Sequence, residues 1–298
     1  MSNAEPRFGR LITAMVTPFN DERELDLDRA QALATRLIEG GNDSLIINGT
    51  TGESPTVFYP QKIELFRAVV EAVGGKASVI ANVGDNCTAD TVNFAKDVAK
   101  LGVDGFMCVV PYYNKPPQEG MYQHFKTIAN AVELPIILYN IPGRCVVNME
   151  AETTLRLAND CENVIAVKEA SGKMDQIATI AAAAPEGFSV YSGDDSATYD
   201  IMRLGGAGVI STTGNVAPER MKELVTKCAE GKWDEAWAAH EALLPLMNGL
   251  FETSNPILVK EALKLVGFPV GGVRLPLIDA TAEQSARLAS IMREVGVL

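Results

Sequence analysis

The chain has 298 residues, of which 47% are hydrophobic and 21% are charged, and its formal net charge at pH 7 is −12. This composition is typical of a folded globular protein, and an acidic balance without a basic stripe excludes a general binder of the nucleic-acid backbone. No uncharged apolar run reaches the roughly 18 residues that a membrane-spanning helix needs, and the first ten residues lack the apolar core of a secretion signal, so we expect a cytoplasmic protein that does not bind membranes.

Short apolar runs rich in β-branched residues alternate with longer amphipathic stretches along most of the chain. The runs are apolar throughout rather than alternating with polar residues, which is typical of parallel strands covered by helices on both faces. Gly, Asn, Asp or Pro residues bound them. The predicted strands are 11–16, 44–47, 78–81, 105–109, 135–139, 164–167, 188–191 and 208–210.

Helical periodicity fills the gaps between these strands, for example over 27–39, 61–73, 88–101, 119–132 and 151–159. Thr88 begins one helix, and the glycine pairs at 40–41 and 74–75 end two others. Eight strand–helix units in one series, without a break in composition, favour a closed (β/α)₈ TIM barrel. The alternative is an open, doubly wound sheet.

Beyond about residue 218 the pattern is helical throughout, with apolar periods over 217–230, 232–247, 256–266 and 280–295. We therefore expect residues 1–231 to form the catalytic barrel. Residues 232–298 would form a C-terminal helical extension that packs on the barrel and is not independent, because no linker separates it. This extension could cap the bottom of the barrel, form an oligomer contact, or do both.

In a TIM barrel the chemistry lies where each strand ends and the following loop begins. Lys168 takes such a position, because it directly follows the apolar run 164–167. Burial disfavours the charged form of an amine and lowers its pKa, and a neutral amine can attack a ketone to form an imine. Lys168 is therefore a candidate nucleophile. The alternative is a rim lysine paired with Glu169 or another carboxylate.

Hydroxyl side chains at neighbouring strand ends could move a proton for that imine. Tyr139 ends the preceding strand, and a phenol can act as a proton shuttle when its partners assist it. Thr51 and Tyr113 follow two other strands, and each can both donate and accept a hydrogen bond. These residues predict a relay. Considered alone, the segment around Thr51 is equally a strand-to-helix turn, and the Tyr112–Tyr113 pair is equally a loop anchor or a subunit contact.

Arg144 follows Pro142 and Gly143 on the loop after the fifth strand. An arginine on a loop held by such residues can bind a carboxylate through two parallel hydrogen bonds; its alternative is an ordinary solvated charge. Gly49 and Gly52 permit a tight turn with exposed N–H groups, which also suits a carboxylate ligand.

Metal sites find little support in the sequence. His124 and His240 both lie in helical patterns, and no third carboxylate is placed near Asp194 and Asp195. The five cysteines form no CxxC pair, so we expect reduced and mostly buried thiols. The sequence therefore predicts no metal ion.

Six motifs occur in order between Gly9 and the end of the chain: GTTGES, PYYNKPPQEGMYQHF, LYNIPGR, VKEASG, YSGDD and GGAGVIS. In these motifs the chain resembles the dihydrodipicolinate synthase / N-acetylneuraminate lyase family, and its synthase branch in particular. The resemblance implies a homotetrameric TIM barrel, built as a dimer of dimers, with a C-terminal helical domain. It also implies class I aldolase chemistry without a metal or an organic cofactor.

The same resemblance implies roles for individual residues. Lys168 of VKEASG would form a Schiff base with pyruvate. Tyr139 of LYNIPGR would shuttle protons through Thr51 to Tyr113, a tyrosine that family tetramers take from the adjacent subunit. Arg144 would bind the carboxylate of the second substrate. The residues implied to bind pyruvate are Thr50, Thr51, Gly193 and Ile210.

Features of three motifs favour the synthase branch: the Thr50–Thr51 pair where lyases and many sugar-acid aldolases have Ser-Thr, the arginine at position 144, and the PYYN loop. The expected reaction condenses pyruvate with L-aspartate 4-semialdehyde in the diaminopimelate route to lysine. One alternative is another pyruvate-dependent aldolase or dehydratase of the family, acting on a keto-deoxy sugar acid or N-acetylneuraminate. Another is a catalytically silent member that regulates or binds.

Many bacterial and plant members of the synthase branch bind lysine as a feedback inhibitor between two subunits. Lys62 stands where sensitive enzymes often have histidine or glutamate, and its positive charge would repel the amines of the inhibitor. We therefore expect weak or absent inhibition by lysine. The positions implied for this site are Ser54, Tyr59, Lys62, Asn86, Asp90 and Tyr112.

Overall fold

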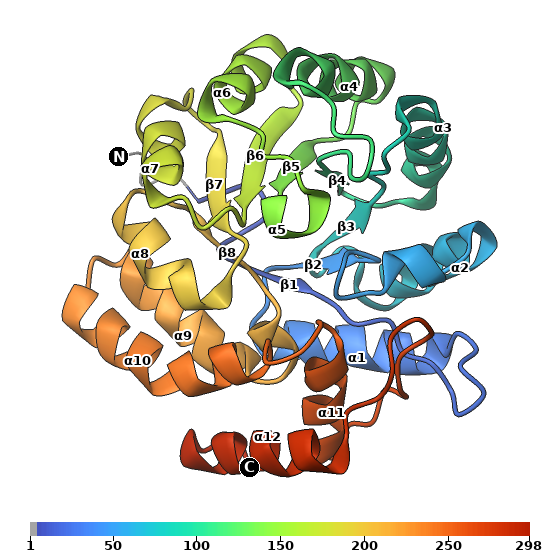
Figure 1. Cartoon of the computed structure of the whole chain (residues 1–298), viewed down its shortest axis with the longest axis vertical. Coiled ribbons are helices and arrows are strands. Elements are labelled where there is room, and N and C mark those ends of the chain that lie inside the picture. Colours follow the sequence, from blue (N-terminus) through green and yellow to red (C-terminus); the bar gives the residue numbers. More distant parts are fainter. Residues whose placement is uncertain (1–4) are drawn as a thin grey trace.

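The computed structural model describes residues 5–298, and its eight parallel strands close into a barrel (Figure 1). Each strand pairs with its neighbours in sequence, and β8 pairs back with β1. The predicted (β/α)₈ barrel is therefore confirmed, and the open-sheet alternative is wrong. The strands are β1 (Leu11–Ala14), β2 (Ser44–Ile47), β3 (Ser78–Asn82), β4 (Gly105–Val109), β5 (Ile136–Asn140), β6 (Val164–Glu169), β7 (Ser189–Ser192) and β8 (Gly208–Ser211).

Helices surround the barrel, and α1 shows why they begin and end where they do. The Asp26 side chain accepts a hydrogen bond from Arg29 N at the start of α1, and Gly40 follows its last residue. In residues 5–298 no helix is both long and apolar enough to cross a bilayer. The surrounding helices are α1 (Leu27–Glu39), α2 (Tyr59–Val73), α3 (Thr88–Val98), α4 (Gln118–Ala131), α6 (Ala151–Asp160), α7 (Met174–Ala183), α8 (Thr198–Arg203) and α9 (Pro218–Ala229), with the one-turn α5 (Pro142–Cys145) in the loop after β5.

Two apolar clusters divide the core. Outward-facing strand residues pack against the helices, and inward-facing residues fill the barrel. The inner cluster includes Ile137, Ala166 and Ile210. Tyr139 also belongs to it and lies two residues beyond Ile137 on β5. Because side chains alternate along a strand, the inward direction of Ala166 is shared by Lys168.

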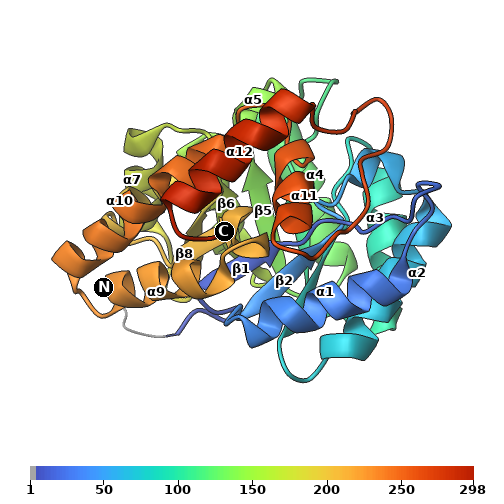
Figure 2. The same cartoon turned by 90° about the horizontal axis from the view of Figure 1, so that it is seen from below.

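The C-terminal helices lie together outside the ring, where α10 packs on α9 and α12 packs on both α10 and α11 (Figure 2). The predicted boundary between residues 231 and 232 falls in the turn between α9 and α10. These helices are α10 (Trp233–Gly249), α11 (Ile257–Leu265) and α12 (Ala282–Glu294).

The prediction of helix throughout the C-terminal region is wrong for residues 266–281, which form an irregular segment. Gly267 and Gly271 have φ of +79° and +71°. A Cβ on Gly271 would lie 2.0 Å from Phe19 O, so only glycine fits that close approach. Phe19 N donates to Val270 O, and Phe19 lies in the loop that follows β1. The segment therefore reaches the face of the barrel where the strands end.

Candidate active site

Strand register brings Lys168 beside Tyr139. The pairing of β5 with β6 shifts by one residue between Ile136 and Ile137, so that Tyr139 pairs with Lys168 across the two strands. This shift leaves Ile165 of β6 without a partner in the register. The Lys168 Nζ lies 4.4 Å from the centroid of the Tyr139 ring. The two predicted reactive groups are therefore adjacent at the end of the inner cluster.

Lys168 is buried, with only 6% of its surface exposed. The carboxylate of Glu169 does not form an ion pair with Lys168. It accepts hydrogen bonds from Asn140, Gln176 and Ser171 N instead. Within residues 5–298 the Lys168–Glu169 alternative is therefore wrong. Burial lowers the pKa of Lys168 to about 8, the carboxylate of Asp195 opposes this shift, and the guanidinium of Arg144 adds to it.

Asp195 is a charged neighbour of Lys168 that the sequence reasoning did not select. Its Oδ2 accepts hydrogen bonds from Thr212 N at 3.0 Å and from Thr213 N at 2.8 Å, and burial raises the pKa of the carboxyl. Its Oδ1 has no partner among the described residues. Its place just beyond the end of β7 is the signal in the sequence that could have identified it.

Tyr139 is also buried, and this burial raises the pKa of its phenol to about 12. A hydrogen bond with the Thr50 side chain acts in the opposite direction and lowers that pKa, but its effect is smaller. The structure differs here from the predicted relay, which ran through Thr51. The Thr51 hydroxyl accepts a hydrogen bond of 2.9 Å from Asn255 Nδ2 and lies 3.5 Å from the Thr212 hydroxyl. Successive residues of this turn face different directions, so Thr50 meets Tyr139 and Thr51 does not.

Tyr113, the last member of the predicted relay, is not brought to Tyr139 within this chain. Its side chain is 88% exposed, and its backbone has a φ of +75°. Such a conformation is unusual for an aromatic residue and presents the ring to the outside of the chain.

Arg144 lies on α5 and lines a cleft with a volume of about 450 Å³. Thr50 and Tyr139 line the same cleft, so the predicted guanidinium, phenol and threonine hydroxyl meet at one opening. Arg144 is itself exposed, which leaves its guanidinium free to receive a carboxylate.

The two remaining residues implied to bind pyruvate lie on β8 and just after β7. Ile210 belongs to the inner cluster. Gly193 N donates to Glu169 O at 2.8 Å, and a Cβ at Gly193 would lie 2.7 Å from that of Ala170. Glycine at 193 therefore allows the end of β7 to approach the end of β6 closely, beside Glu169 and Ala170.

The six positions implied for lysine binding divide between two cavities that share Lys62. Ser54 and Tyr112 line the cleft, whereas Tyr59 and Asp90 line a second cavity of about 250 Å³. Asn86 lies beside them and donates to Tyr112 O. The Lys62 Nζ donates to the Ser54 hydroxyl at 3.3 Å, and burial lowers its pKa.

Comparisons with known proteins identify relatives of the whole chain. The model of the dihydrodipicolinate synthetase family matches residues 7–295. A 4-hydroxy-tetrahydrodipicolinate synthase from Moorella thermoacetica is 53% identical over 98% of this chain and 100% of its own length. One from Symbiobacterium thermophilum is 50% identical over the same shares. The solved structure of the synthase from Cyanidioschyzon merolae with lysine bound is 46% identical, with a TM-score of 0.97 over 99% of this chain and 100% of that one.

Proposed function

The chain belongs to the dihydrodipicolinate synthetase family, and from this premise we propose that it catalyses the 4-hydroxy-tetrahydrodipicolinate synthase reaction. In that reaction pyruvate condenses with L-aspartate 4-semialdehyde on the diaminopimelate route to lysine. The observation that carries the proposal is Lys168, a buried lysine whose amine lies 4.4 Å from the ring of a buried tyrosine. Full-length identity near one half to synthases supports the choice of reaction.

Lys168 is the proposed nucleophile. With a pKa of about 8, roughly one lysine in ten is neutral at pH 7, against roughly one in three thousand at its ordinary value. The neutral amine attacks the keto carbon of pyruvate, water leaves, and a protonated imine remains as an electron sink. Loss of a methyl proton then gives the enamine that attacks the aldehyde.

Tyr139 is the proposed proton shuttle, and its raised pKa supports that role because the phenol stays protonated at neutral pH. It can give its proton to the departing hydroxyl of the carbinolamine and recover one through the Thr50 hydroxyl. Thr51 would bind the pyruvate carboxylate. We propose that Tyr113 completes the relay from a second copy of the chain, in a cytoplasmic homotetramer. Its exposure in the single chain supports this assignment.

Turnover of pyruvate with L-aspartate 4-semialdehyde by the purified protein tests the proposal. The product would be followed by coupling to its pyridine-nucleotide reductase, with N-acetylneuraminate cleavage assayed in parallel. The exposed cation of Arg144 favours the acidic aldehyde over a neutral polyhydroxy chain, so cleavage of the sugar acid should be negligible. Efficient cleavage together with absent condensation would assign the chain to the other branch.

The pH dependence of imine formation follows from the lowered pKa of Lys168. Only the neutral amine reacts, so the rate should rise about tenfold per pH unit below 8 and become level above it. An ordinary lysine would continue to rise to about pH 10.5. The rate of borohydride-trappable imine, measured by mass spectrometry between pH 6 and 10, checks this. A rate that still climbs steeply above pH 9 would contradict it.

Inhibition by lysine should be weak. Lys62 places a nitrogen cation at the shared wall of the two cavities, where the amines of the inhibitor would have to approach. We expect millimolar lysine to leave most of the activity, and the Lys62→His variant to become more sensitive. Activity measured against lysine concentration, with arginine as control, decides the point. A strong and saturable loss in the unaltered protein would refute it.

A further inference from the structure

The turn that carries Thr50 and Thr51 is tightly wound. Asn48 and Glu53, at its two ends, have φ of +60° and +55°, a left-handed conformation that disfavours residues with a side chain. A Cβ on Gly52 would lie 2.9 Å from Asn48 Cα. Backbone of this kind persists only where its surroundings hold it. The conformation of the two threonines therefore depends on what contacts the turn.

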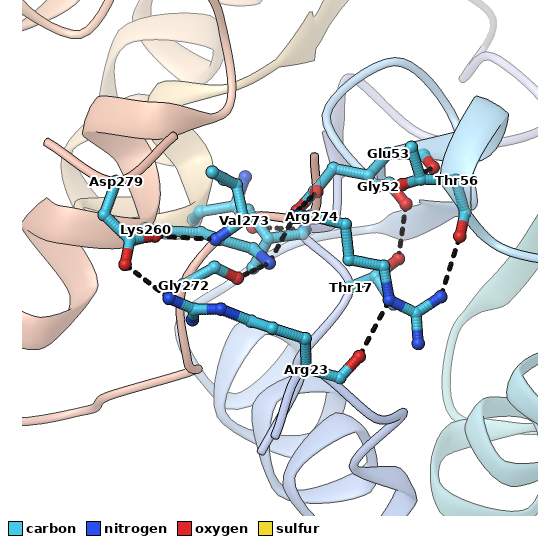
Figure 3. Close-up of polar contacts among 12 residues, drawn as sticks. Thr17, Arg23, Gly52, Glu53, Thr56, Lys260, Gly272, Val273, Arg274 and Asp279 are labelled. Atoms are coloured by element: carbon cyan, nitrogen blue, oxygen red, sulfur yellow. Dashed lines mark hydrogen bonds and ion pairs between the residues drawn. The ribbon is translucent and has the colours of Figure 1, made fainter. Parts of the chain in front are cut away.

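The strongest of these contacts is a buried ion pair between the turn and helix α11. Glu53 Oε1 lies 2.6 Å from Lys260 Nζ, and the two side chains are only 1% and 2% exposed (Figure 3). Glu53 Oε2 accepts a hydrogen bond of 2.9 Å from Arg274 N, and Lys260 Nζ donates to Gly272 O at 2.8 Å. Both charges are thus enclosed by partners from the C-terminal region.

The surroundings of the pair are apolar as well as charged. Both cations lie close to the Phe19 ring, Lys260 Nζ at 4.1 Å and Arg274 Cζ at 4.2 Å from its centroid. Burial lowers the pKa of Lys260 to about 8, although the negative charge of Glu53 raises it in part. A buried pair in such a place is weak evidence of stability, because apolar residues of equal size commonly stabilise a fold as well or better. What the pair adds is one defined geometry.

Other polar contacts from the C-terminal region reach the turn and the residues that follow it. The Arg274 guanidinium donates to Thr56 O at 2.7 Å and to Gln61 Oε1 at 2.8 Å, and Asn255 Nδ2 donates to the Thr51 hydroxyl. These groups come from residues 255–274, some 200 residues beyond the turn. The part of the chain outside the barrel therefore shapes the strand-end loop that faces Tyr139.

We propose that Glu53 and Lys260 are positioning residues, whose buried ion pair holds the Thr50–Thr51 turn in the shape that receives the carboxylate of the keto acid. This inference rests on the proposed function, since it needs pyruvate as the ligand of the turn. The pair does not touch the reacting atoms. It acts through the backbone from Gly52 to Glu53, and its loss would misplace two hydroxyl groups at once.

The Glu53→Gln variant tests this, because it keeps the side-chain volume and removes the charge. The pyruvate concentration that gives half-maximal borohydride trapping should rise by at least about tenfold, since small misplacements of binding groups cost factors of this order or more. The double variant Glu53→Gln/Lys260→Met leaves no unpaired charge. It should recover most of the lost Tm while its half-saturating pyruvate concentration stays raised, which a purely stabilising role would not produce.

Leu288→Ala provides the matched control. Leu288 is a buried residue of α12 away from the turn, so its truncation should lower the Tm while leaving pyruvate saturation unchanged. Half-saturation within about twofold of the unaltered protein in both Glu53 variants would overturn the inference, and so would failure of both to fold. If the unaltered protein traps no pyruvate, the proposed function itself is wrong, which is a separate outcome.

Discussion

The Lys168→Ala variant will gain no mass from pyruvate and borohydride, and its condensation activity will fall by about four orders of magnitude or more, because the substitution removes the amine proposed to form the imine. Among residues 5–298 the amine it removes is buried and forms no ion pair with a carboxylate, so the substitution should leave the fold intact. Mass spectrometry of the intact protein measures the first effect, and circular dichroism checks the second.

A second buried lysine makes this experiment sharper. Burial lowers the pKa of Lys260 to about 8, the same value as that of Lys168. Lys260 is ion-paired with Glu53 at 2.6 Å and is only 3% exposed, so we expect that pyruvate cannot reach its amine. Peptide mapping should therefore find the adduct on Lys168 alone. Lys173→Ala, on an exposed neighbour, should trap normally, and an adduct that survives in Lys168→Ala would refute the assignment.

The Arg144→Ala variant should separate the two substrates. Arg144 lies at the opening of the cleft that Tyr139 lines, and it is exposed enough to receive a carboxylate through two hydrogen bonds. Its removal should lower kcat/KM for L-aspartate 4-semialdehyde by about 100-fold, equivalent to about 2.7 kcal/mol. Saturation with pyruvate should change little, because the imine forms deeper in the barrel.

Steady-state rates with each substrate varied in turn, together with pyruvate trapping, measure this separation. Arg144→Lys should recover only part of the loss, since an ammonium keeps the charge but cannot form two parallel hydrogen bonds. Arg67→Ala, on an exposed face of α2, is the control for removal of a surface cation. Equal losses for both substrates would mean that Arg144 acts on the lysine, whose pKa its charge also lowers.

Side-chain periodicity alone determined much of this protein. The apolar runs and the helical stretches between them predicted the barrel, because strands covered on both faces must be apolar throughout. The alternation of side chains along β6 and the position of Lys168 at its end predicted a buried amine at the rim. The order of the motifs predicted the family, which the full-length match confirmed.

Tertiary structure decided the contacts that depend on register and on distant segments. The register shift between Ile136 and Ile137 sets Tyr139 opposite Lys168, and no local sequence pattern predicts a one-residue shift. Thr50, and not Thr51, forms the hydrogen bond with Tyr139 because of the conformation of the left-handed turn. The ion pair between Glu53 and Lys260, which are 207 positions apart in the sequence, holds this turn. Periodicity determines the direction of a side chain within its own element. Which distant groups it meets is decided only when the barrel closes and the C-terminal segment packs against it.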